Sequence, residues 1–92
     1  MASDRRLKKN IRNIGYGLKE IKKLRPVSFE WKNEKQKRFG FIAQEVLEII
    51  PEIVGGSKKT HYSISPMEVI PMLVKAIQEL STEVERLKKI KK

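Results

Sequence analysis

The longest regular pattern of hydrophobic positions lies in the C-terminal third of the chain. Apolar residues recur there at alternating intervals of three and four, which places them at the a and d positions of three heptads. These positions, which we call the seam, are Ile70, Leu73, Ile77, Leu80, Val84 and Leu87. Glu83 at position g would face Lys88 at position e of a parallel neighbour, which favours parallel order. Residues 65–92 are therefore predicted to form a coiled-coil helix.

The start of this helix is marked by Ser65, Pro66 and Glu68. Ser is favoured as an N-cap, Pro is favoured at the first helical position, and Glu three residues after Ser completes a capping box. Pro71 lies within the first two turns, where the loss of one amide hydrogen bond costs least.

The seam allows two interpretations. A single apolar stripe also suits a helix that packs on its own domain. However, residues 81–92 extend beyond the body predicted for residues 1–64, so the last seam positions need partners from another chain. β-branched residues at a with Leu at d favour two strands, whereas Val74 and Ala76 widen the apolar face beyond what a dimer buries. The pattern leaves dimer and trimer open.

Shorter patterns precede the long helix. The spacing of apolar residues over 18–24 predicts a helix that ends before Pro26. Apolar and polar positions alternate over 27–31 and again over 39–43, on either side of a polar stretch. This arrangement predicts a β-hairpin, and its aromatic face is expected to lie in the core.

A second set of short elements follows the hairpin. Helical spacing over 44–50 stops at Pro51, and residues 53–64 contain two extended pieces around a Gly-Gly turn. The predicted fold class is therefore α+β. It combines a small β-hairpin body with short helices over residues 1–64 and a long C-terminal helix over residues 65–92, which together make one functional domain.

Composition narrows the class of protein. The chain has 92 residues and a mass of 10.7 kDa, which leaves room for one small domain and rules out most large catalytic scaffolds. There is no Cys, and the one His, His61, has no neighbour at a metal-ligand spacing, so no metal or other cofactor is expected. Oligomerisation remains as the means of supporting so small a core. Neither a membrane-spanning stretch nor a signal peptide is predicted.

The charge balance raises an alternative function. The chain has 21 Lys and Arg residues against 11 Asp and Glu residues, a formal net charge of +10. Basic residues near both ends would suit phosphate contacts; they are Arg5, Arg6, Lys8, Lys9, Arg12, Lys88, Lys89, Lys91 and Lys92. The basic residues are scattered, however, and no helix-turn-helix or zinc motif is present. A solvated basic surface is favoured, and a small nucleic-acid-binding protein is the alternative.

Residues 3–11 read Ser-Asp-Arg-Arg-Leu-Lys-Lys-Asn-Ile. This stretch resembles the motif Ser-Asp-x-Arg-x-Lys-x-x-Ile, which opens the endosialidase-type intramolecular chaperone domains at the C-termini of phage tail spikes, tail fibres and neck appendages. The similarity continues in order through residues 24–32, 40–46 and 51–54 and ends with Tyr62 and residues 71–80. Five blocks in order are far more specific than any one of them.

The resemblance implies a homotrimeric module that promotes folding and trimerisation of an upstream fibre or spike domain of the same polypeptide. It also implies a single-turnover serine peptidase that cuts the bond between Ala2 and Ser3, with Ser3 as nucleophile and Lys8 as general base. The expected location is the host cytoplasm during phage assembly, with the parent protein in the virion tail or appendage. A permanent trimerisation module that lacks cleavage is the alternative within the same family.

The two residue types suit this chemistry. A Ser hydroxyl attacks poorly until a base takes its proton, and Lys accepts a proton only in its neutral form. Desolvation favours neutral Lys8, and so do the neighbouring cations Arg5, Arg6 and Lys9.

The spacing of Ser3 and Lys8 sets a further condition. Five residues correspond to a separation of about 140° around a helix and to opposite faces of a strand, so the pair cannot meet on regular structure. Either the chain bends between them or Lys8 serves a neighbouring subunit's serine. Leu7, Ile11 and Ile14 are the expected apolar anchors of this segment. Only two residues precede Ser3 here, and an idle pair is expected in a chain of this length.

Overall fold

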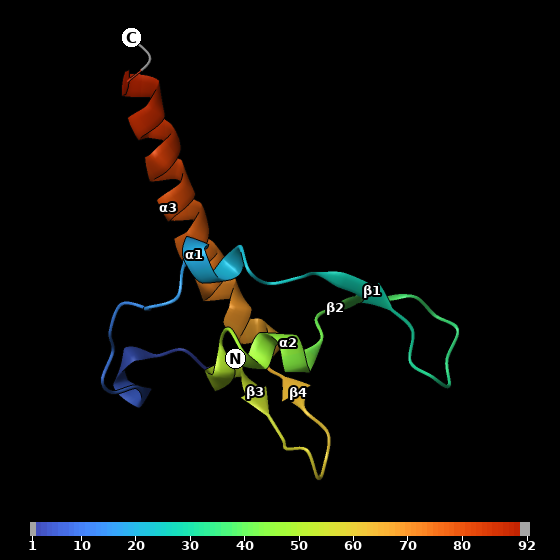
Figure 1. Ribbon diagram of the computed structural model, residues 1–92. Coiled ribbons are helices and arrows are strands. Elements are labelled where there is room, and N and C mark those ends of the chain that lie inside the picture. The colour runs from blue at the N-terminus through green and yellow to red at the C-terminus, as the bar shows by residue number, and fades with distance from the viewer. Residues whose placement is uncertain (1, 91–92) are drawn as a thin grey trace.

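The molecule consists of a small body from which one long helix projects (Figure 1). The structure is a computed structural model that describes residues 2–90, so Met1, Lys91 and Lys92 lie outside the described residues. The elements in chain order are η1 (Arg5–Leu7), α1 (Leu18–Ile21), β1 (Val27–Phe29), β2 (Arg38–Gly40), α2 (Ala43–Leu47), η2 (Pro51–Ile53), β3 (Val54–Gly55), β4 (Ser63–Ile64), η3 (Pro66–Glu68) and α3 (Val69–Ile90). Each strand pair, β1–β2 and β3–β4, is antiparallel. The predicted α+β class, with two small hairpins and a long C-terminal helix, is confirmed.

The core is small and lies where α2 and η2 meet the first turns of α3. Its buried residues are Val46, Ile50, Ile53, Val69 and Met72. Half-buried side chains from the first hairpin, the second hairpin and the segment before α1 pack around this cluster. Burial within the chain is thus concentrated near the start of α3.

The first hairpin differs from the prediction, because its aromatic face is not the core. Phe39 is 80% exposed and Trp31 is 55% exposed. The register pairs Ser28 with Phe39, so the Phe39 side chain lies on the Ser28 face of the sheet and not with Phe29. Phe41, just after β2, does pack against the core. Alternation predicted the hairpin, but β2 ends at Gly40, Ala43 begins α2, and the aromatic residues do not share one face.

The short helices are shorter than their sequence patterns. α1 ends at Ile21 and α2 ends at Leu47, each followed by a turn. The predicted capping box at Ser65 is absent, since the Ser65 side chain makes no capping hydrogen bond. Its carbonyl instead accepts from the Glu68 amide at 3.2 Å, and this bond closes the 3₁₀ turn η3. Pro71 lies in the first turn of α3, as predicted.

Two hydrogen bonds, which we call the bracket, join residues 14–18 to α3. The Lys75 ammonium group donates a hydrogen bond to the Ile14 carbonyl, and the Leu18 amide donates to the Glu79 carboxylate at 2.8 Å. A Cβ atom on Gly17 would lie 2.0 Å from the Glu79 Oε1 atom, so glycine permits this close approach. The bracket fixes where the N-terminal segment leaves the body.

Candidate functional site

The N-terminal arm, residues 2–13, contains one ordered turn. The Leu7 amide donates to the Asp4 carbonyl at 3.0 Å, and the Lys8 amide donates to the Arg5 carbonyl at 3.1 Å. These two i→i+3 bonds define η1. Lys8 itself has an extended backbone, with φ −117° and ψ 152°, so the chain changes direction at this residue.

The turn brings Lys8 back to Ser3 within one chain. The Lys8 Nζ atom donates a hydrogen bond to the Ser3 Oγ atom at 2.8 Å, across five positions in sequence. This is the first of the two arrangements that the spacing allowed, a bend between the residues. Both side chains are exposed, and so is the neighbouring Ala2. A hydroxyl group and an amino group are thus in contact on the exposed surface of the arm.

A solvent-exposed ion pair between Asp4 and Arg6 spans the same turn. The Arg6 Nη2 atom lies 2.8 Å from the Asp4 Oδ2 atom, and the Arg6 amide donates to Asp4 Oδ1 at 2.8 Å. The hydrogen bonds from Arg6 lower the pKa of the Asp4 carboxyl, and the same pair raises the pKa of the guanidinium group. Asp4 therefore stays charged and caps the turn over a wide pH range.

The expected apolar anchors of the arm behave differently from one another. Leu7 is 74% exposed and Ile11 is 58% exposed, so neither holds the arm to the body. Only Ile14 packs against the core. Asn10 has a φ of 53°, in the left-handed region, and marks a reversal of the arm between these residues. The arm therefore extends from the body as a loop, visible in blue in Figure 1.

Three contacts that the sequence patterns did not reveal hold the base of the arm. Two are the bracket contacts of Lys75 and Glu79, and the third is a hydrogen bond of 2.6 Å from the Tyr16 hydroxyl to the Glu52 carboxylate. This bond lowers the pKa of Glu52 and raises that of Tyr16. Each contact joins residues at least 36 positions apart, so no local spacing could have indicated it.

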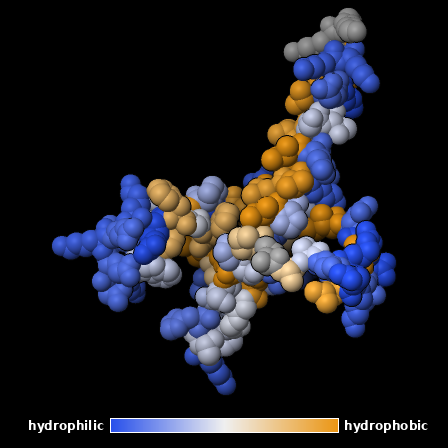
Figure 2. Space-filling model, turned by 180° about the vertical axis from the view of Figure 1, so that it is seen from behind, coloured by the Kyte–Doolittle hydropathy of each residue, from blue (hydrophilic) through white to orange (hydrophobic). Residues whose placement is uncertain are grey.

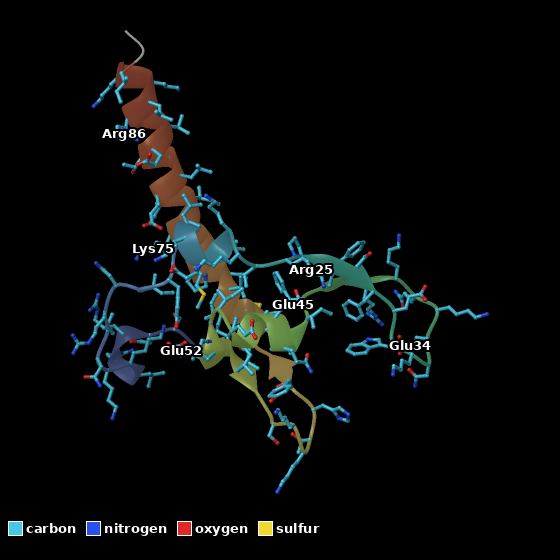
Figure 3. All side chains as sticks on the ribbon, viewed as in Figure 1. Arg25, Glu34, Glu45, Glu52, Lys75 and Arg86 are labelled. Atoms are coloured by element: carbon cyan, nitrogen blue, oxygen red, sulfur yellow. The ribbon has the colours of Figure 1, made fainter. Side chains whose placement is uncertain are left out.

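The hairpin is tied to α2 by Arg25 and Glu45 (Figure 3). The Arg25 Nε and Nη2 atoms donate to the two Glu45 carboxylate oxygens at 3.0 and 2.7 Å. This bidentate pair lowers the pKa of Glu45 and raises that of Arg25. The pair fixes the segment that leads into β1 against the body.

The seam is exposed along the whole of α3. The exposed fractions of its side chains range from 41% at Leu73 to 66% at Ile77. α3 packs on its own body through another face, which carries Val69, Met72 and Ala76. Ala76 is therefore used within the chain and does not widen the exposed apolar face. Figure 2 shows a band of apolar side chains along one side of the helix and polar side chains along the other.

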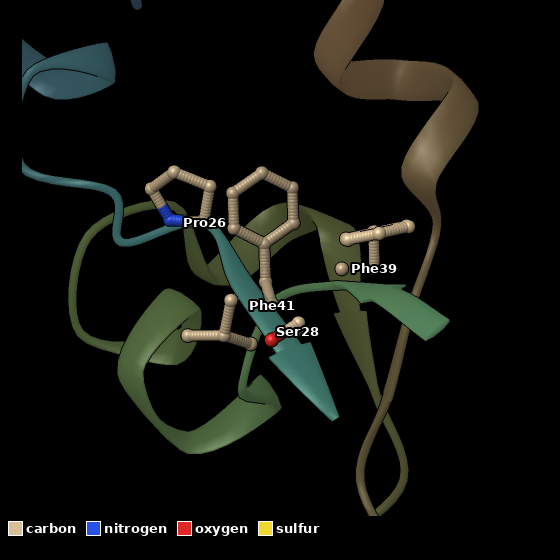
Figure 4. Close-up of a pocket in the computed structure, with 6 residues that line it drawn as sticks. Pro26, Ser28, Phe39 and Phe41 are labelled. Atoms are coloured by element: carbon tan, nitrogen blue, oxygen red, sulfur yellow. The ribbon is translucent and has the colours of Figure 1, made fainter. Parts of the chain in front are cut away.

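Two pockets lie on the first hairpin. One is lined by Pro26, Val27, Ser28, Phe39, Gly40 and Phe41 (Figure 4). The other lies between the two hairpins and is lined mainly by aromatic and apolar residues. Neither pocket includes Ser3 or Lys8.

Among residues 2–90, no group of three potential ligand side chains is placed to hold a metal ion. No helix in the same range has the length and apolar character needed to span a membrane.

Comparison with known families agrees with the motifs. The model of a family described as the chaperone of endosialidase matches residues 3–55, more than half of the chain. The matched segment begins at Ser3 and contains Lys8, α1, the first hairpin and α2. The resemblance found in the sequence is thereby confirmed, although Tyr62 and residues 71–80 lie beyond the match. No curated protein matches the chain significantly.

Proposed function

Because the chain belongs to the chaperone of endosialidase family, we propose that it promotes the folding and homotrimerisation of an upstream fibre or spike domain of the same polypeptide. It is then released by autoproteolysis before Ser3. We also propose a division near residue 65, between a body that carries the cleavage motif and a C-terminal helix that forms the coiled coil. The observation that carries the proposal is the 2.8 Å hydrogen bond between Lys8 and Ser3, at the first residue of the family match.

The proposed cleavage is an attack by Ser3 on its own preceding bond. Neutral Lys8 takes the proton from the Ser3 hydroxyl, and the oxygen attacks the carbonyl carbon of Ala2 through a five-membered ring. The bond from that carbon to the Ser3 nitrogen breaks, and the nitrogen receives the proton from Lys8. Ala2 is then joined to Ser3 through an ester. Water hydrolyses the ester, which leaves a carboxylate on Ala2 and restores the Ser3 hydroxyl.

Trimerisation acts as the trigger for this reaction. Three copies joined along the exposed seam bring three arms around one body assembly. In that assembly Lys8 is shielded from water and loses its proton more readily. Cleavage therefore follows assembly, and the chaperone leaves only a trimer that has already formed. The Ser3–Lys8 contact within one chain supports an arrangement in which each chain supplies both members of its own pair.

The test is to express the chain with its native upstream segment and to measure intact mass. The expected result is a cut before Ser3 that is lost in Ser3→Ala and in Lys8→Ala. Lys9→Ala is the matched control, since it removes the same charge one position away; loss of this neighbouring cation should slow cleavage without abolishing it. Light scattering on the same samples should give a trimer for all four proteins.

Other outcomes assign a different function. An uncut trimer would make the chain a permanent trimerisation module. An uncut monomer that binds a random DNA duplex, with an affinity that falls steeply as salt rises, would make it a nucleic-acid-binding protein. In either case the autoproteolytic function would be wrong.

A further inference from the structure

The turn between Ser3 and Lys8 has little to hold it apart from its own polar contacts. No side chain in residues 2–13 is buried, and η1 is only three residues long. An isolated helical turn of that length is unfavourable, because nucleation fixes several dihedral angles for very few hydrogen bonds. Interactions within the turn itself must therefore stabilise the geometry that brings the Lys8 Nζ atom to the Ser3 Oγ atom.

Asp4 and Arg6 supply that local stabilisation. The Asp4 Oδ1 atom accepts from the Arg6 amide at 2.8 Å, which satisfies a backbone donor at the start of the turn. The Arg6 guanidinium group then donates to both carboxylate oxygens, from Nε at 3.2 Å and from Nη2 at 2.8 Å. One side chain thus caps the turn, and the other holds the cap in place.

We infer that Asp4 and Arg6 are positioning residues that hold Lys8 against Ser3, an inference that rests on the proposed autoproteolysis. Neither touches the scissile bond in this role; both act through the turn. The lowered pKa of Asp4 and the raised pKa of Arg6 agree with an interaction that favours both charged forms. The planar fork of arginine suits this task, whereas a lysine offers a single point charge and cannot bond both oxygens in the same way.

Arg5 provides a matched control. It lies in the same turn and is exposed, and its side chain makes no hydrogen bond or ion pair within residues 2–90. Arg5→Ala and Arg6→Ala remove the same charge from neighbouring positions. A purely electrostatic role of the basic arm predicts equal effects of the two changes, whereas a positioning role predicts a clearly larger effect of Arg6→Ala.

The first measurement is the first-order rate of cleavage in the chain that carries its native upstream segment. We expect Arg6→Ala to slow cleavage about fivefold, and Arg5→Ala, which removes only a neighbouring cation, to slow it less than about twofold. Asp4→Asn keeps an oxygen that can cap the turn and should fall between the wild type and Asp4→Ala. The Asp4→Ala/Arg6→Ala double variant should be little slower than the slower single variant, since both changes break one unit. Equal rates for Arg5→Ala and Arg6→Ala would overturn the inference.

The second measurement does not depend on cleavage. In the chain of 92 residues, backbone NMR couplings of residues 5–7 report the φ angles of the turn. These couplings should shift toward unfolded values in Arg6→Ala and stay unchanged in Arg5→Ala. A turn that persists in Arg6→Ala would overturn the positioning role. If the wild-type fusion is not cut while the couplings respond as expected, the proposed autoproteolysis fails, and Asp4 and Arg6 retain only the role of holding the turn.

Discussion

Glu79, in the middle of α3, accepts a hydrogen bond at 2.8 Å from the backbone amide of Leu18, the first residue of α1. The two residues are 61 positions apart, and the contact joins the N-terminal segment to the long helix. Lys75, one turn earlier, donates to the carbonyl of Ile14. The helix that carries the exposed seam therefore also fixes the base of the arm that carries Ser3 and Lys8.

Loss of the Glu79 contact is expected to weaken the body. In Glu79→Ala the Leu18 amide loses its partner, and the free energy of unfolding should fall by about 1 kcal/mol. Urea unfolding followed by circular dichroism, at one fixed protein concentration, measures this change. Glu85→Ala is the control, because Glu85 is an exposed acidic residue on the same helix, outside the bracket. An equal loss in both variants would contradict a specific role for Glu79.

A charge in the seam is expected to abolish assembly. Leu80→Asp places carboxylates where copies of the helix would meet, and association should weaken by about a hundredfold. Light scattering should then report the 10.7 kDa mass of a single chain. Gln78→Asp adds the same charge to α3 outside the seam and should keep the trimer. In the fusion with the upstream segment, Leu80→Asp should also stop cleavage although Ser3 and Lys8 are unchanged, and undiminished cleavage by a monomer would disprove the assembly trigger.

The proposed ester between Ala2 and Ser3 can be trapped. Hydroxylamine attacks esters far faster than amides, so it should raise the cleavage rate of the fusion and leave a hydroxamate on Ala2, which intact mass resolves from the carboxylate. Ser3→Ala should give neither product. Release of only the carboxylate at every hydroxylamine concentration would indicate direct attack of water on the peptide bond.

The hydrogen bond from Tyr16 to Glu52 should make stability depend on pH in the acid range. It lowers the pKa of Glu52 in the folded state, so its contribution is fully present above the ordinary carboxyl value and is lost as the pH falls through the folded value. The stability difference between the wild type and Tyr16→Phe should therefore be largest near neutral pH and shrink below about pH 4. Urea midpoints from pH 7 to pH 3 measure it. Tyr62→Phe is the control and should show no such trend relative to the wild type.

Local sequence patterns predicted most of the helices and strands but fewer of the contacts between them. The heptads predicted α3, and the seam lies on a face that its own body leaves exposed. Alternation predicted the first hairpin, but it could not show that Phe39 lies on the Ser28 face, because the face on which a side chain lies depends on strand register. The spacing of Ser3 and Lys8 allowed a contact within one chain or between two chains. The turn at Arg5–Leu7 produces the contact within one chain.

The sequence by itself determined the α+β class, the long C-terminal helix, the seam and the family, because periodicity and ordered motifs are properties of neighbouring residues. Only the tertiary structure decided which face of α3 packs on the body, that Leu7 and Ile11 stay exposed, and that Tyr16, Lys75 and Glu79 hold the base of the arm. These features depend on residues far apart in the chain. Their contacts depend on how the few buried side chains pack together, and the spacing of residues along the chain does not indicate that packing.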